Sequence, residues 1–129
     1  MNKNRAKIQL DPLSDSFKSI VNLQDGDSII TTAQLIKGIF QGNPSGSISI
    51  TLPSAEQLIK EWPLIPISGY SRTFTIRNDS PNSIITIIPG KGGVINGSDV
   101  ISASKYAAHY RLRFSDVTSG VESYVIIRE

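Results

Sequence analysis

The residues best suited to chemistry surround His109, the only histidine of the chain. Alternating apolar and basic residues predict a strand over Lys105–Phe114, and one face of it carries Lys105, His109, Arg111 and Arg113. Imidazole can serve as an acid, a base or a metal ligand. Because no acid, nucleophile or second ligand lies near His109 in the sequence, the pattern predicts a basic contact face and no catalytic or metal site. We expect this face to meet solvent or a neighbouring subunit, with phosphate or an acidic partner surface as the alternative.

A lysine among glycines, in the segment PGKGG at residues 89–93, could cradle a phosphate. A P-loop needs glycine five residues before its Gly-Lys pair and serine or threonine after it. Ile85 and Gly92 stand at those positions. The segment is also expected to join two strands, so it lacks the helix N-terminus that attracts an anion. The sequence therefore predicts an ordinary loop tip here.

The composition narrows the class of protein further. A chain of 129 residues suffices for one domain with its own core. It has no cysteine, which excludes disulfides and thiolate metal sites, and its net charge of +2 does not demand a nucleic-acid partner. No apolar run is long enough to span a membrane, and the first ten residues lack the apolar core of a signal peptide. We expect synthesis in a cytoplasm, no membrane span, no cofactor and no enzymatic activity.

The elements that would position these groups centre on Tyr70–Ile88. Apolar residues alternate from Tyr70 to Ile76, interrupted only by Arg72, which indicates a strand with one buried face. Turn-forming residues occupy positions 78–82. Ser83–Ile88 then follows with β-branched residues on both faces, as expected of a central strand. The two runs together predict a hairpin with a longer loop.

Other segments predict an all-β fold. Thr32 is expected to cap a helical turn, and Ser54 to cap the one convincing helix, SAEQLIKEW, with Gln57 completing a capping box. About eight short strands and one short helix, without a βαβ rhythm, favour a β-sandwich or a jelly-roll-like barrel. Besides the strands named above, we predict strands over residues 28–31, 47–52 and 120–128.

The chain divides into an N-terminal arm, residues 1–24, and a single β-sandwich domain, residues 25–129. A frayed terminus is the simplest interpretation of the arm. The alternatives are an arm that reaches a neighbouring subunit through Phe17 and Ile20, and a basic arm that touches nucleic acid.

The final strand, residues 120–128, carries apolar groups on both faces. We predict that Tyr124 and Ile126 turn away from the core and lie in a subunit interface. Exposed aromatic platforms would instead indicate glycan binding, and the only candidates for such platforms are Trp62, Tyr70 and Tyr124.

Several loosely spaced motifs recur in order over Thr31–Arg128. They are TTAQLIKGIF, a strand ending in TLPSAEQLI, a strand closing in TIRNDS, a glycine-rich loop near GGVINGS, and the closing FSDVTSGVESYVIIRE. This order resembles small virion proteins of tailed phages and large DNA viruses, the Marseillevirus-type giant viruses among them. The resemblance covers most of the chain and leaves out the N-terminal region to about Leu23.

The resemblance implies a β-sandwich or jelly-roll-like subunit that forms a homotrimer in or on a virion and contacts other virion proteins. It transfers no catalytic motif. The expected function is therefore a capsid-associated or decoration-type structural subunit. Two alternatives are a host glycan- or receptor-binding module of a viral fibre or surface, and a virion-borne nucleic-acid-binding factor that uses the basic face. The latter would bind with an affinity that falls steeply with salt.

Overall fold

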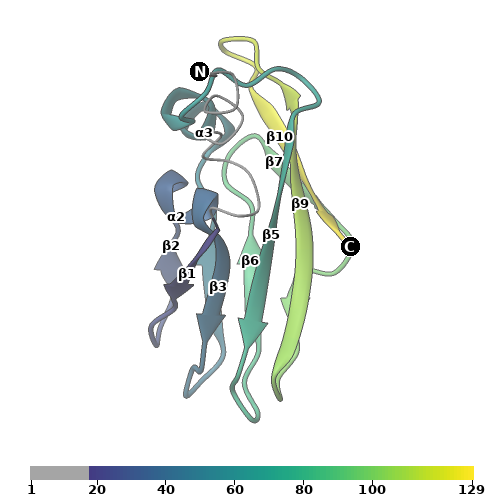
Figure 1. The fold of residues 1–129 in the computed structure, drawn as a ribbon. Coiled ribbons are helices and arrows are strands. Elements are labelled where there is room, and N and C mark those ends of the chain that lie inside the picture. Colours follow the sequence, from purple (N-terminus) through teal and green to yellow (C-terminus); the bar gives the residue numbers. More distant parts are fainter. Residues whose placement is uncertain (1–17) are drawn as a thin grey trace, which may run out of the picture.

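The structure is a computed structural model that describes residues 18–129, and in them two β-sheets lie face to face with two short helices near one end (Figure 1). Sheet A contains, from edge to edge, β1 (Ser19–Asn22), β3 (Gly38–Gly42), β5 (Ser71–Asn78), β9 (Tyr106–Asp116), β10 (Ser123–Arg128) and β7 (Gly93–Asn96). Sheet B contains β2 (Ser28–Ile29), β4 (Ile48–Thr51), β6 (Ile85–Ile88) and β8 (Val100–Ile101). The predicted all-β architecture is confirmed, with ten strands in the described residues and neither sheet closed into a barrel.

The first half of the described chain winds as a coil, because each connection leads from one sheet to the other. β1, β3 and β5 are parallel neighbours in sheet A, and β2, β4 and β6 are parallel neighbours in sheet B. Parallel neighbours need a crossover connection, and each crossover here runs through a strand of the opposite sheet. Jelly rolls are built from Greek keys of antiparallel strands, so this parallel coil is a different arrangement of two layers.

The predicted hairpin over residues 70–88 is wrong. β5 lies in sheet A between β3 and β9, whereas β6 lies in sheet B between β4 and β8. The turn residues between them form an arch that joins the two sheets. Asn78 is buried at its start, where its amide donates to the carbonyls of Ser83 (2.8 Å) and Ile101 (3.2 Å) and its oxygen accepts from the N–H of Ser80 (3.0 Å). The predicted central position of β6 in its sheet is confirmed.

Helix α2 (Thr32–Lys37) joins β2 to β3 and is capped by Thr31, not by Thr32 as predicted. Thr31 has the extended backbone that a capping residue needs, and its hydroxyl accepts from the N–H of Gln34 at 3.1 Å. The Gln34 side chain accepts in return from the Thr31 N–H at 3.0 Å, which completes a capping box. Gly38 ends the helix with a φ of 86°, a conformation that favours glycine.

Helix α3 (Ala55–Glu61) joins β4 to β5 and is capped by Ser54 as predicted, but the Gln57 side chain does not accept from the Ser54 N–H, so the predicted capping box is incomplete. The Ser54 hydroxyl accepts from the N–H of Gln57 at 3.1 Å. Trp62 ends the helix and is 6% exposed, with its ring edge-to-face against Phe114 at a centroid distance of 5.2 Å. The indole therefore closes one end of the core. Neither of these helices, the two that residues 18–129 form, is long and apolar enough to cross a membrane.

The core lies between the two sheets, and the alternation predicted for β4, β5 and β9 is confirmed. The inner faces of these strands and of β6 bury Ile48, Ile50, Phe74, Ile76, Ile85, Ile87, Ala108, Tyr110, Leu112 and Phe114. Arg72 shares the inner face of β5 and is 6% exposed. Its Nε donates to the carbonyl of Ile36, in the last turn of α2, at 3.0 Å. This contact explains the interruption of the apolar pattern, because a cation is favourable at a helix C-terminus and its methylene stem packs among apolar groups.

The predicted orientation of β10 is wrong, because Tyr124 and Ile126 face the core of their own chain. They are 1% and 0% exposed, and β10 pairs them in register with the core residues Phe114 and Leu112 of β9. Both faces of this strand are apolar, so its period could not indicate the inner one. Neither side chain is available for an interface with another subunit.

The segment predicted as an N-terminal arm contributes β1, which pairs in parallel with β3 at the edge of sheet A. Ile20, one of the predicted interface residues, lies on this strand and is 54% exposed. Phe17, the other, lies outside the described residues. The boundary between arm and domain stays a prediction.

Candidate interaction surfaces

Three of the basic residues predicted to share a face, His109, Arg111 and Arg113, lie along the outer side of sheet A. His109 and Arg113 are exposed on β9, Arg111 is half-buried between them, and Lys105 stands just before the strand. Because β9 pairs with β5, hydroxyl groups of β5 lie beside these basic residues. The pairs are Ser71–Arg113, Thr73–Arg111 and Thr75–His109. We call this surface the basic face.

Part of the charge on the basic face is paired. The Arg111 guanidinium contacts the Glu129 carboxylate at 2.8 Å and donates to the Ser71 hydroxyl at 2.9 Å. His109 Nδ1 lies 3.0 Å from the Thr75 hydroxyl oxygen. These contacts are exposed or half-buried, so water screens them and each contributes little to stability. The basic face thus has the character of a solvated sheet surface.

The outer side of sheet B has the opposite composition, and we call it the sheet B face. Ile29 is 78% exposed there, Ile88 43% and Ile84 39%. None of the outward side chains on the strands themselves is charged; together with the flanking Ser47 and Ile84, they are Ile29, Ser49, Thr51, Thr86, Ile88 and Val100. Asp27, just before β2, is the charged residue at this edge, and its carboxylate accepts from the N–H of Ser49 at 2.8 Å.

A second exposed apolar surface is the link from α3 to β5. It presents three large apolar side chains, Leu64, Ile65 and Ile67. Ile65 is 95% exposed, and the neighbouring Pro63 and Pro66 restrict the backbone on either side of it. The N–H of Gly69 donates to the carbonyl of Phe114 at 2.7 Å, which fastens the link to the end of β9. We call this surface the apolar link.

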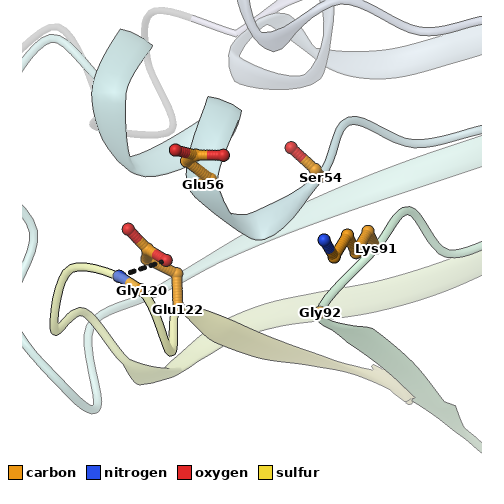
Figure 2. Close-up of a pocket in the computed structure, with 6 residues that line it drawn as sticks. All are labelled: Ser54, Glu56, Lys91, Gly92, Gly120 and Glu122. Atoms are coloured by element: carbon orange, nitrogen blue, oxygen red, sulfur yellow. Dashed lines mark hydrogen bonds between the residues drawn. The ribbon is translucent and has the colours of Figure 1, made fainter.

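A pocket of about 350 Å³ lies where the start of α3, the 89–93 segment and the turn before β10 meet (Figure 2). Its lining residues are Ser54, Glu56, Lys91, Gly92, Gly120 and Glu122. The carboxylates of Glu56 and Glu122 lie on one side and the Lys91 amine on the other (Figure 2). Glu56 and Lys91 are exposed, so water screens their charges. Within residues 18–129, no group of three or more His, Cys, Asp or Glu side chains is placed to hold a metal ion.

Two of the glycines around Lys91, Gly90 and Gly93, allow the backbone to pack closely against the side chain of Tyr124. The Tyr124 hydroxyl accepts from the N–H of Gly90 at 2.8 Å and donates to the carbonyl of Pro53 at 2.9 Å. Gly93 lies so close to the Tyr124 ring that a Cβ would overlap it. Burial raises the pKa of the Tyr124 hydroxyl, and the hydrogen bond from Gly90 lowers it by a smaller amount. The segment joins β6 to β7, as predicted, and its glycines let the backbone approach a buried tyrosine.

The three aromatic side chains that glycan binding would need form no exposed platform. Trp62 and Tyr124 are 6% and 1% exposed, and Tyr70 is half-buried with its ring stacked on Phe114. Tyr106 is 45% exposed, and its hydroxyl accepts from Arg128 at 3.2 Å.

The sheet B face was not recognised as a surface from the sequence. Its signal was present, because Ser47–Thr51 alternates between serine or threonine and isoleucine, Ile84–Ile88 is apolar on both faces, and neither segment contains a charged residue. What was missing was the pairing of these distant segments as neighbours in one sheet, which the register of β4 and β6 supplies.

The chain was compared with family models, with curated proteins and with solved structures, and none of them matches it significantly.

Proposed function

We propose that this protein is a non-enzymatic structural subunit of a virion, of the capsid-associated or decoration type, built as a β-sandwich that associates with copies of itself as a homotrimer. The virion assignment and the number three rest on the resemblance of residues 31–128 to small virion proteins. Self-association is supported by the distribution of exposed apolar side chains.

The single observation that carries the proposal is the clustering of these side chains. Single exposed apolar residues are normal on any protein, whereas contiguous patches mark sites of protein contact. Six of the ten large apolar side chains exposed in the described residues lie on only two surfaces. Three belong to the sheet B face and three to the apolar link, and they are Ile29, Ile84, Ile88, Leu64, Ile65 and Ile67.

The test is the mass of the full chain in solution, measured by size-exclusion chromatography with light scattering over a range of protein and salt concentrations. We expect three times the 14.0 kDa of the chain. High salt should not dissociate the assembly, because salt screens charges and leaves apolar contacts in place. A monomer at every concentration would overturn the proposal, and a stable dimer would overturn the trimer alone.

The basic face supports a second candidate function, nucleic-acid binding, because His109 and Arg113 are both exposed on it, with Arg111 between them. Binding of a labelled DNA or RNA duplex would then weaken steeply as salt rises. Removal of Arg113 by Arg113→Gln should weaken binding equally for all sequences, since contacts to phosphates carry no sequence information. No binding at low salt would exclude this function.

A further inference from the structure

Sheet B is a largely parallel sheet with one uncovered side. Parallel sheets occur almost only with both faces covered, because their crossovers place other layers over them. β2, β4 and β6 are parallel, but their crossovers run through sheet A, and both helices contact strands of sheet A. The described part of the chain therefore covers the inner side of sheet B and leaves the outer side open, as the 78% exposure of Ile29 shows.

The outward side chains on the strands of sheet B line up in two uncharged rows, with Asp27 flanking the second row at the β2 edge. One row runs across β2, β4 and β6 through Ile29, Thr51 and Ile88. The other runs across β4, β6 and β8 through Ser49, Thr86 and Val100. The solvated face of a sheet commonly carries polar side chains in alternation with the buried ones. Rows of isoleucine, valine, threonine and serine without a charged side chain are suited to burial.

The absence of charge also indicates what covers the face. In a closed symmetric oligomer, identical surfaces converge around an axis, so each charged group would meet its own copies. The basic face, with Arg111 and Arg113, would repel another basic face in this way. The sheet B face can meet a second sheet B face without such repulsion. A strongly charged partner, by contrast, would gain nothing from a surface that offers no counter-charge.

We propose that the sheet B face is buried against further copies of this chain, with the identical faces meeting around the axis of the homo-oligomer. Around a three-fold axis each copy of the face meets its two neighbours, and β-branched side chains on neighbouring copies can interlock there. This inference rests on the proposed self-association and names the surface that produces it.

The first test places a charge in the middle of the face. Thr86→Lys introduces an ammonium group on the central strand β6, where a long side chain can still reach water in the monomer. We expect association at least about 100-fold weaker than that of the unmodified chain, with unchanged circular dichroism. Thr75→Lys is the matched control, because Thr75 is also half-buried, outward-facing and on a central strand, but of sheet A. It should leave the mass unchanged.

A second test does not depend on the folding of a lysine variant. The chain has no cysteine, so a single introduced one can be labelled without background. Ile88→Cys probes the sheet B face and Val94→Cys probes the outer side of sheet A, at positions 43% and 61% exposed. With a bulky maleimide we expect labelling of Ile88→Cys to be at least tenfold slower at assembling concentrations than on dilution. The labelling rate of Val94→Cys should not depend on concentration.

The outcomes separate this inference from the proposed function. A wild-type oligomer whose Ile88→Cys variant labels at the same rate at all concentrations would overturn the inference and leave self-association intact. A wild-type monomer would overturn the proposed function itself. Slow labelling of Ile88→Cys in a monomer would show that the chain covers its own face, which also overturns the inference.

Discussion

Successive strands of the coil alternate between sheet A and sheet B, yet the outer face of one sheet is basic and that of the other is uncharged on its strands. The outer face of sheet A carries His109, Arg111 and Arg113 on β9 beside the hydroxyl groups of β5. The outer face of sheet B carries no charge on any of its strands. Threonine and β-branched residues suit the pleated surface of both sheets. The faces therefore differ in charge far more than in strand propensity.

This difference assigns each face to an environment. An arginine cannot leave water without a partner at an acceptable free energy, so the charges of the basic face keep it solvated. Serine, threonine and isoleucine can be buried against a similar surface at little cost. An oligomer built on the sheet B face would hold the basic face on its outside, where a partner molecule could reach it.

The largest expected effect separates the two sides of β6. Ile87 faces the core and is 1% exposed, whereas its neighbour Ile88 faces outward and is 43% exposed. We expect Ile87→Ala to lower the free energy of unfolding by about 2–5 kcal/mol, because it leaves a cavity. Ile88→Ala should lower it by about 1 kcal/mol or less, and weaken association instead. Urea unfolding in the Thr86→Lys background, which we expect to be monomeric, measures both; equal losses would contradict the assignment of the two sides.

A smaller effect, on the pH dependence of stability, distinguishes the inner face of sheet A from that of sheet B. The inner face of sheet A buries two tyrosines that can ionise. Burial raises the pKa of Tyr110 and Tyr124 above the ordinary 10.0, so the unfolded chain loses these protons first. The contribution of these two tyrosines to stability should therefore be constant well below pH 10 and fall as the pH rises through 10 and on to the folded pKa. Tyr124→Phe should cost about 1–3 kcal/mol at neutral pH, because it leaves the Pro53 carbonyl without its donor. It should also reduce the alkaline loss, and an unchanged alkaline slope would contradict the role of this hydroxyl.

The smallest expected effect lies on the basic face. Arg111 and Glu129 form an ion pair whose side chains are 40% and 39% exposed. Glu129→Gln should change the free energy of unfolding by about 0.5 kcal/mol or less. That change should vanish in high salt, because salt screens exposed charges. Thermal unfolding at low and high salt measures it, and a salt-independent loss above about 1 kcal/mol would show that this face is less solvated than the structure indicates.

The sequence by itself determined the local features of this protein. Alternation in β4, β5 and β9 correctly predicted which side chains are buried, because a strand's period of two is an intrinsic property of its backbone. The cap of α3 at Ser54 and the turns at glycine followed from local hydrogen bonding and φ preferences. His109, Arg111 and Arg113 occupy alternate positions of β9, so the period of two by itself puts them on one side of sheet A.

Features that depend on residues far away in the sequence, such as strand pairing and the choice of the buried side of a strand, followed only from the tertiary structure. β5 and β6 are consecutive and separated by a turn, yet they belong to different sheets, because each pairs with strands far away in sequence. β10 is apolar on both sides, so only its register with β9 chose Tyr124 and Ile126 as the inner pair. Arg72 is buried because α2 ends beside it. The sheet B face exists only through the pairing of segments 20 to 40 residues apart, and local periodicity carries no information about such pairing.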